Sequence, residues 1–256
     1  MTAAALRSYH SAPLRTPGPP VRPVSASITS LAPPKRLRQK VRRGETLYAA
    51  GGAFRLLYVV RVGVMKSFTV SGDGLVQVTG FHFAGDVLGF DGIDSGTHQS
   101  SVVALDDCEV FVVPFAQCER WSAESPQAQR LMMRTLAREL LRSQELMLLL
   151  GTMHAEQRVA TFLLDISERY ARLGYSRSEF ILRMTRQDIG SYLGLKLETV
   201  SRIFSRFQAE GLLQVQGKSL AVLDFNALWR ISGLSPDRRW PACDSILDRD
   251  GELRAA

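Results

Sequence analysis

The stretch from residue 185 to residue 223 constrains the fold most, because it carries the start and stop signals of two helices in close succession. Thr185 and Asp188 have the form of a capping box, in which a hydroxyl and a carboxylate satisfy free N–H groups at a helix start. Gly194 stands where a left-handed residue can end that short helix, and a second helix starts near Leu197. Two helices joined by such a turn are typical of a helix-turn-helix.

The second helix is amphipathic and is followed by a hairpin. Its apolar face consists of Val200, Ile203, Phe204 and Phe207. Gly211 ends the helix, and two short strand patterns then flank Gly217 and Lys218. Helix, turn, helix and hairpin in this order predict a winged helix-turn-helix, a fold that places its second helix in the major groove of DNA.

The polar face of the second helix carries side chains that can read bases. Arg202 can donate two hydrogen bonds to guanine, Glu198 can accept one from cytosine, and Ser201 can approach a thymine methyl group or a base edge. Their spacing places all three on one side of the helix. The side chains that we expect to contact phosphates, which position the protein without specifying sequence, are Arg186, Gln187, Lys196, Thr199, Arg206 and Lys218.

A simpler interpretation of Glu198 and Arg202 is an ordinary ion pair on the helix surface, worth only ~0.3–0.5 kcal/mol. That interpretation suits the two residues taken alone. The capping box, Gly194 and the hairpin around them favour DNA reading instead.

Residues 36–115 carry the signals of short strands. The strand-like segments are 56–62, 64–70, 76–81, 101–105 and 109–113. Eleven of the twenty glycines lie between residues 44 and 96, where they can form the turns between these segments. Short, closely spaced strands of this kind predict a β-roll or barrel.

From Pro126 the pattern changes to that of one long helix, with Gly151 as its expected end. Apolar residues recur on one face of this helix and arginines lie on another. Such a helix can pack on its own β-domain, pair with its twin in a homodimer, or do both. The residues predicted to form the dimer seam are Met132, Met133, Leu136, Leu140, Ser143 and Met147.

Charge is distributed unevenly along the chain. Residues 1–43 hold nine Lys or Arg and no acidic residue, so the net charge of +7 is weak evidence for nucleic-acid binding by the rest. Seven of the eleven prolines also lie before residue 35, which favours disorder there. We therefore divide the chain into a basic proline-rich tail at 1–34, a β-roll at 35–125, a dimerisation helix at 126–152, a winged helix-turn-helix at 153–233 and a C-terminal tail at 234–256.

Composition argues against several other classes of protein. No apolar run approaches the ~20 residues of a membrane helix, and the N-terminal residues lack a signal-peptide pattern. The three cysteines, Cys108, Cys118 and Cys243, predict a reducing cytoplasm and no disulfide scaffold. His82 and His98 are isolated, unlike the clustered ligands of a metal-dependent oxygenase, so we expect no enzyme.

The segments 80–86, 89–91 and 185–206 resemble the Crp/Fnr regulators, in particular the fumarate-and-nitrate-reduction regulator branch. The resemblance spans about residues 40–233, and Glu198, Ser201 and Arg202 match the recognition pattern of the branch. It implies an α+β fold with an N-terminal cyclic-nucleotide-binding-like β-roll, a long dimerisation helix and a C-terminal winged helix-turn-helix. It further implies a transcription activator that binds a TTGAT-like inverted repeat as a homodimer. RNA polymerase would be contacted through β-roll loops, one of which falls at Ser71–Gly74.

Three departures from this family bear on regulation. Oxygen-sensing relatives hold an iron–sulfur cluster with N-terminal cysteines and one in the β-roll, whereas this chain has no cysteine before Cys108 and has Phe111 at the β-roll position. Those relatives carry an acid on the dimer helix where this chain has Ser143, so like-charge repulsion across the seam is removed. Lys196 stands where the family has a hydroxyl cap on the recognition helix. We therefore expect no cluster, and a dimer that forms without a cofactor.

The β-roll lacks the cation that a cyclic nucleotide needs. Residues 67–119 contain no Lys or Arg, and burying a phosphate without a paired charge is costly. We therefore expect no cyclic nucleotide, no metal and no other cofactor. We also expect acids such as Asp86 and Asp91 to form turns on a solvated face.

An alternative within the same fold is a regulator whose DNA binding requires an unidentified signal. That signal would be a neutral ligand, a haem on His82 or His98, or oxidation of Cys108 and Cys118. For the two cysteines, the simpler interpretation is a pair of small residues packed near a strand and a loop.

Overall fold

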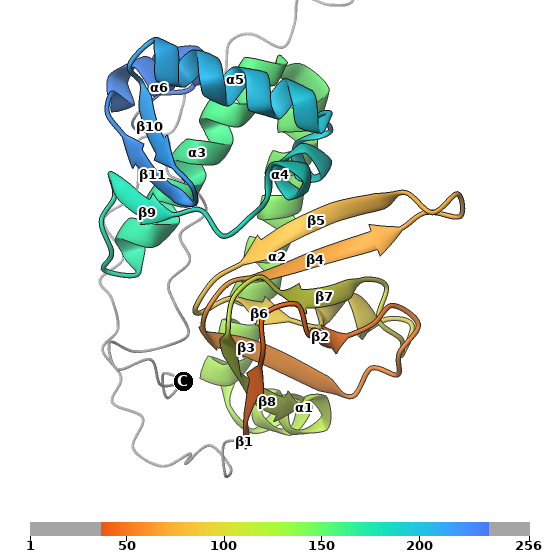
Figure 1. Ribbon diagram of the computed structural model, residues 1–256. Helices are drawn as coiled ribbons and strands as arrows, with labels where there is room; N and C mark the ends of the chain where they lie inside the picture. The colour runs from red at the N-terminus through yellow and green to blue at the C-terminus, as the bar shows by residue number, and fades with distance from the viewer. Residues whose placement is uncertain (1–36, 236–256) are drawn as a thin grey trace, which may run out of the picture. The chain divides into compact units, whose positions relative to one another are not determined.

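The computed structural model describes residues 37–235, and Figure 1 shows how their helices and strands are arranged. Two antiparallel sheets come first, a long helix follows, and a smaller unit of helices with a third sheet comes last. This is the α+β fold that the sequence predicts. The predicted N-terminal tail, and all but the first two residues of the predicted C-terminal tail, lie outside the described residues.

Two four-stranded sheets form the β-roll. The first has the order β1 (Leu37–Val41), β8 (Cys108–Pro114), β3 (Leu56–Val62) and β6 (Val87–Leu88). The second has the order β2 (Thr46–Tyr48), β7 (Ser101–Ala104), β4 (Met65–Val70) and β5 (Val76–His82). All pairings are antiparallel, so short glycine turns suffice between neighbours such as β4 and β5. A single turn of 3-10 helix, Phe90–Gly92, interrupts the roll.

Alternating side chains of the two sheets fill the space between them. Val60, Met65, Val102 and Val110 are completely buried there. The sequence predicts β3, β4, β5, β7 and β8 from their length and β-branched content, and the structure confirms these strands. It gives little signal for the short strands β1, β2 and β6, which form because partner strands supply their hydrogen bonds.

The long helix α2 (Pro126–Thr152) begins where the sequence predicts. Ser125 precedes it, and its hydroxyl oxygen accepts a hydrogen bond from the N–H of Ala128 at 3.2 Å. Pro126 stands at the first helical position, where its missing N–H costs nothing. A preceding helix, α1 (Phe115–Glu124), was not predicted from the sequence. The hydroxyl of Ser122 in α1 lies 3.5 Å from the sulfur of Met132, so Met132 faces α1 and is half-buried.

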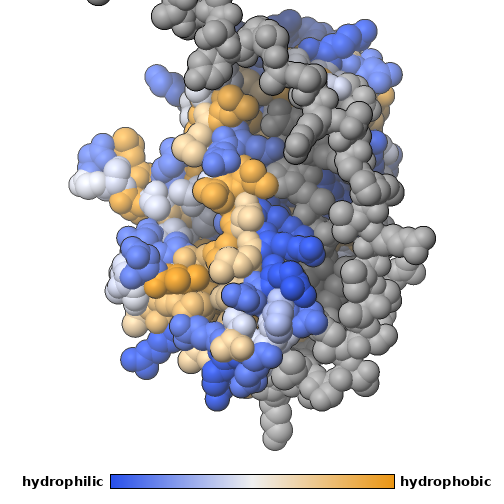
Figure 2. Space-filling model, turned by 180° about the vertical axis from the view of Figure 1, so that it is seen from behind, coloured by the Kyte–Doolittle hydropathy of each residue, from blue (hydrophilic) through white to orange (hydrophobic). Residues whose placement is uncertain are grey.

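One face of α2 exposes large apolar side chains. Met133, Leu140 and Met147 follow a seven-residue spacing and are 60%, 60% and 63% exposed, and Leu141 and Leu148 lie beside them. Figure 2, which views the molecule from behind, shows apolar residues in a band down this side. Ser143 is exposed and its hydroxyl donates to the carbonyl of Glu139, whereas Leu136 is half-buried. Within the described residues, the exposed apolar side chains of the predicted seam are Met133, Leu140 and Met147.

The C-terminal unit is built on α3 (Ala155–Arg172). Around it lie α4 (Arg186–Leu193), α5 (Leu197–Ala209) and α6 (Phe225–Ser232), with a sheet of order β10 (Leu213–Gln216), β11 (Ser219–Val222) and β9 (Glu179–Ile181). The core of this unit includes Phe162, Leu163, Ile189, Phe207 and Leu228, all nearly or completely buried. No described helix has the length and apolar content needed to cross a membrane.

A buried carboxylate joins the β-roll to the helices. Asp86 is 4% exposed, which corrects the expectation that it lies on a solvated face. Arg142 of α2 donates to it at 2.7 Å, Arg169 of α3 lies 3.7 Å away, and the backbone N–H of Phe83 donates at 2.9 Å. Arg169 also donates to Asp165 and to the carbonyl of Phe81. Charges from three parts of the fold therefore compensate one another.

The electrostatic balance at Asp86 has a definite direction. Burial alone raises the pKa of its carboxyl group, but the guanidinium groups of Arg142 and Arg169 outweigh burial and hold the pKa well below its ordinary value. A carboxylate with a depressed pKa stabilises the fold above its unfolded pKa of ~3.9 and loses that contribution as the pH falls toward the folded value.

We predict that Asp86→Asn lowers the free energy of unfolding at pH 7 by about 3 kcal/mol, because it removes the buried carboxylate that two half-buried arginines share. The decline in stability below about pH 4 should also be shallower than in the wild type. Urea unfolding across this pH range measures both effects. Asp94→Asn, at an exposed carboxylate of the same region, serves as the control and should stay within about 0.5 kcal/mol of the wild type. Equal stability of the two variants would contradict the assignment.

Candidate nucleic-acid interface

The turn between α4 and α5 is fixed by local hydrogen bonds and by two glycines. The N–H of Asp188 donates to the hydroxyl oxygen of Thr185 at 3.0 Å, and the N–H of Thr185 donates to the carboxylate of Asp188 at 2.9 Å. The capping box is therefore formed as predicted. Gly194 has a φ of 62° and ends α4 in the left-handed conformation. A Cβ on Gly190 would lie 2.6 Å from the carbonyl oxygen of Leu195, so only glycine lets the turn close this tightly.

Arg158 of α3 connects the C-terminal ends of two other helices. Its guanidinium donates to the carbonyl oxygens of Leu150 and Met153 at the end of α2, and to that of Leu193 at the end of α4. Carbonyls at helix ends have no partner within the helix, and a cation suits the negative end of the helix dipole. The placement of α4 is thus coupled to α2 and α3.

Helix α5 presents its polar face away from the core. Val200, Ile203, Phe204 and Phe207 are buried, as their spacing predicts. On the other side Glu198 and Arg202 are exposed and Ser201 is half-buried. The ion pairs of the described residues include none that joins Glu198 to Arg202 or either residue to another group. Both charged groups are thus accessible to a partner.

The predicted phosphate-contacting residues lie around α5 in different states. Gln187, Lys196 and Lys218 are exposed and Thr199 is half-buried. Lys196 provides no side-chain cap for α5. Arg206 is paired with Glu156 of α3 and with Glu210 at 2.7 Å, so its charge is already partly compensated. Sequence reasoning gave no sign of that pairing, because Glu156 lies fifty residues away.

A groove of about 240 Å³ separates the start of α3 from α5. Its lining residues are Ala155, Glu156, Thr199, Arg202, Ile203 and Arg206. The groove thus combines one base-reading candidate with two of the phosphate-contacting candidates.

The β-roll contacts α4 directly, which the sequence did not predict. The Nζ of Lys66 in β4 lies 2.5 Å from the carboxylate of Asp188, the residue that caps α4. The hydroxyl of Ser191 donates to the carbonyl of Val76 and accepts from the N–H of Val78. It therefore joins α4 to the backbone of the edge strand β5. Burial opposes ionisation of Asp188, but its hydrogen bonds to Lys66 and Thr185 keep its pKa below the ordinary value.

Both parts of the chain match known families. Residues 157–231 match the Crp-like helix-turn-helix domain, and residues 38–124 match the cyclic nucleotide-binding domain. The transcriptional regulatory protein btr of Bordetella pertussis is 44% identical over 196 residues, which cover 77% of this chain and 81% of that protein. The fumarate and nitrate reduction regulatory protein of Escherichia coli K12 is 42% identical over 196 residues, which cover 77% of this chain and 78% of that protein. The chain belongs to the Crp/Fnr family of transcription regulators.

This Crp/Fnr regulator is also similar to the solved structure of FixK2 from Bradyrhizobium japonicum. The TM-score is 0.71 at 32% sequence identity, covering 78% of this chain and 98% of that chain. The family assignment and the winged helix-turn-helix identify the chain as a DNA-binding transcription regulator, and its named relatives are regulators and not enzymes.

In the β-roll of the regulator, a side chain occupies donors that could otherwise bind an anion. The carboxylate of Asp91 accepts from the N–H groups of Gln99 and Ser100 at 3.0 and 2.8 Å, and from the Ser100 hydroxyl at 2.7 Å. His98 lies 3.2 Å from the same carboxylate and stacks on Tyr48. Asp91 was expected to form a turn. Its carboxylate holds the turn at Gln99 and Ser100 by accepting their N–H groups, which are then not available to another anion.

The residues of the β-roll do not fit an iron–sulfur cluster. Cys108 is buried and its thiol donates to the carbonyls of Val64 and Asp106, and Phe111 is completely buried in β8. The sequence offers three cysteines, whereas an all-cysteine cluster takes four thiolates. Across residues 37–235, no three His, Cys, Asp or Glu side chains are grouped to hold a metal ion.

Both histidines of the β-roll are packed inside it. His82 is 6% exposed and its Nε2 lies 2.9 Å from the hydroxyl of Ser67; burial lowers its pKa. His98 is 4% exposed and faces Asp91 and Tyr48.

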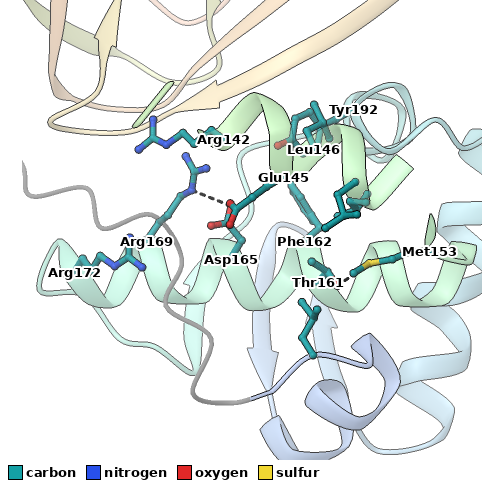
Figure 3. Close-up of a pocket in the computed structure, with 13 residues that line it drawn as sticks. Arg142, Glu145, Leu146, Met153, Thr161, Phe162, Asp165, Arg169, Arg172 and Tyr192 are labelled. Atoms are coloured by element: carbon teal, nitrogen blue, oxygen red, sulfur yellow. Dashed lines mark hydrogen bonds and ion pairs between the residues drawn. The ribbon is translucent and has the colours of Figure 1, made fainter. Parts of the chain in front are cut away.

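A cavity between α2 and α3, drawn in Figure 3, measures about 50 Å³, far below the ~300 Å³ of a small-molecule site. Figure 3 also shows Arg169 directed at Asp165 along its wall.

We predict that Cys108 and Cys118 react slowly in the folded protein. Burial raises the pKa of each thiol to about 11, so little thiolate exists at neutral pH. In a Cys243→Ser background, alkylation by iodoacetamide at pH 7.5 should be at least about a hundredfold slower than in urea. Mass spectrometry of the two cysteine peptides measures the rates. Rapid alkylation of either native thiol would support the thiol-switch alternative.

Proposed function

We propose that the regulator binds a TTGAT-like inverted repeat as a cytoplasmic homodimer and activates transcription by contacting RNA polymerase, without a cyclic nucleotide or an iron–sulfur cluster. The observation that carries the proposal is the polar face of α5, where Glu198 and Arg202 are exposed beside Ser201 and form no ion pair with any described residue. An exposed carboxylate and an exposed guanidinium four residues apart can form hydrogen bonds with a cytosine and a guanine in one groove.

Exposed polar side chains on the flanks of α5 suit contacts to phosphates and support this orientation of the helix. Gln187 at the start of α4, Lys196 before α5 and Lys218 in the hairpin are exposed around the reading face. The groove between α3 and α5 adds Thr199 to this set. Contacts on several sides of a recognition helix fix its depth and angle in the major groove.

The exposed band on α2 supports dimer formation. Met133, Leu140 and Met147 repeat every seven residues, which is the spacing of a coiled-coil seam. Ser143 adds a neutral hydroxyl to this face, so the like-charge repulsion that an acid at this position would cause is absent. An inverted repeat matches the twofold symmetry of such a dimer.

We predict that Leu140→Glu weakens the dimer by at least about tenfold, because it places a charge in the apolar seam. Sedimentation equilibrium measures the dimer dissociation constant. Gln127→Glu adds the same charge near the start of α2, before the apolar band begins, and should leave association unchanged. An unchanged sedimentation profile for Leu140→Glu would show that α2 is not the seam.

Two features of the β-roll favour regulation without a bound ligand. Asp91 already accepts hydrogen bonds from the N–H groups of Gln99 and Ser100, and the segment 67–119 has no Lys or Arg to offset a phosphate.

The hairpin between β4 and β5 supports the polymerase contact, because it exposes Val70, Leu75 and Val76 around the Ser71–Gly74 turn. Exposed apolar groups at such a tip suit a protein partner.

We predict that Arg202→Ala abolishes selective DNA binding. Loss of a bidentate guanine contact costs ~1–3 kcal/mol per half-site, so the two half-sites together raise Kd by at least about thirtyfold. Fluorescence anisotropy with aerobically purified protein measures binding to an inverted TTGAT repeat and to a scrambled duplex at one salt concentration.

The control is Arg230→Ala, at an exposed arginine of α6 outside the proposed contact set, which should bind like the wild type. Unchanged selectivity in Arg202→Ala would overturn the recognition assignment. Wild-type protein that binds both duplexes equally would point to the ligand-dependent alternative or to a different half-site.

A further inference from the structure

Arg186 is held against an aromatic ring of the recognition helix. Its guanidinium carbon lies 3.4 Å from the ring centroid of Phe204. Arg186 is the first residue of α4 and is half-buried, whereas Phe204 belongs to the core face of α5 and is 2% exposed. The contact therefore connects the start of one helix to the middle of the next.

This contact leaves the hydrogen-bonding capacity of Arg186 unused. A guanidinium donates hydrogen bonds in its own plane, so a contact between its central carbon and a ring face uses none of its five N–H donors. Arg186 forms no ion pair or hydrogen bond with another described residue. Arg206 differs, because Glu156 and Glu210 already accept its hydrogen bonds.

Among residues 37–235, no carboxylate pairs with Arg186. Burial is the cause that lowers the pKa of its guanidinium to about 10, and no neighbouring carboxylate offsets it. The group stays protonated at neutral pH, so a half-buried cation without a partner among the described residues lies beside the reading helix. An anion that approaches this position gains a bidentate partner whose conformation is already fixed.

We propose that Phe204 is a positioning residue for DNA binding: its ring holds Arg186 in place for a phosphate of the bound duplex and sets that contact relative to the base-reading residues of α5. The inference rests on the proposed phosphate contact of Arg186. The ring of Phe204 then positions a DNA contact in addition to packing in the core.

The test compares Arg186→Gln, Phe204→Leu and the double variant in the full-length protein. Anisotropy titrations with the inverted TTGAT repeat over a series of KCl concentrations give the affinity and its salt dependence. Arg186→Gln should weaken binding and reduce the salt slope by about 1.8, since the dimer loses two phosphate contacts. Phe204→Leu should weaken binding and flatten the slope in the same direction, and it should add no further loss in the Arg186→Gln background.

A control separates positioning from general damage to α5. Phe207→Leu alters another completely buried phenylalanine of the same helix, which stacks on no arginine, and should act equally in both backgrounds. Selectivity against a duplex with a substituted guanine should stay unchanged in Phe204→Leu, because phosphate contacts do not specify sequence. A loss from Phe204→Leu that is the same in both backgrounds, or that falls on selectivity, would overturn the inference.

Further variants cover the remaining outcomes. If Phe204→Leu melts below the assay temperature, the same titration with Arg186→Lys tests the inference. Lysine keeps the positive charge but has no planar group to stack on the ring. Weaker binding by Arg186→Lys supports the inference, and wild-type binding refutes it. An unchanged salt slope in Arg186→Gln would overturn the phosphate contact itself and the inference with it, whereas Arg202→Ala tests base reading independently.

Discussion

The buried charge of Asp86 is the constraint on which the arrangement of the regulator depends. A carboxylate removed from water is tolerated only with paired charges, and here Arg142 and Arg169 come from two different helices. Displacing either helix would remove one of the two cations that compensate Asp86, so the β-roll, α2 and α3 favour one arrangement. Hydrophobic contacts between the same elements are less directional and would tolerate sliding. The ion cluster therefore supplies specificity of placement more than stability.

The same arrangement extends from α3 to the reading helix. Arg158 binds the carbonyl ends of α2 and α4, and Lys66 with Ser191 joins α4 to the β4–β5 strands. These contacts all act on α4, whose capping box and tight turn then set the direction of α5. The polar side chains that position α4, namely Arg158, Lys66 and Ser191, thus have hydrogen-bond or ion-pair partners within the protein. Glu198 and Arg202, which we assign to bases, are exposed and form no ion pair within the described chain.

The sequence predicts local features of this site well and distant ones poorly. The capping box of Thr185 and Asp188, Gly194 and the apolar face of α5 are signals within one or two helical turns, and all are found. Asp86 was expected on a solvated face because its partner Arg142 lies 56 residues along the chain, beyond any local pattern. The pairing of Arg206 with Glu156 was missed for the same reason. Helices α1 and α6 were not predicted. Asp224 caps the start of α6 and Gly233 ends it in the left-handed conformation, so local signals for α6 were present in the sequence, whereas α1 has no side-chain cap.

Control of this regulator follows from which groups the fold leaves available. Asp91 fills the donors of the Gln99–Ser100 turn, and the cysteines do not suffice for a cluster, so neither ligand type has the groups that it needs in the β-roll. Ser143 places no charge on the dimer face. The proposed function therefore includes no ligand-dependent step between folding and dimer formation. On the proposed function, DNA occupancy is then set by the concentration of the dimer and by the proteins it meets at the promoter. On the same proposal, dimer concentration depends on the apolar band of α2, so the strength of that band determines the protein level at which target promoters respond.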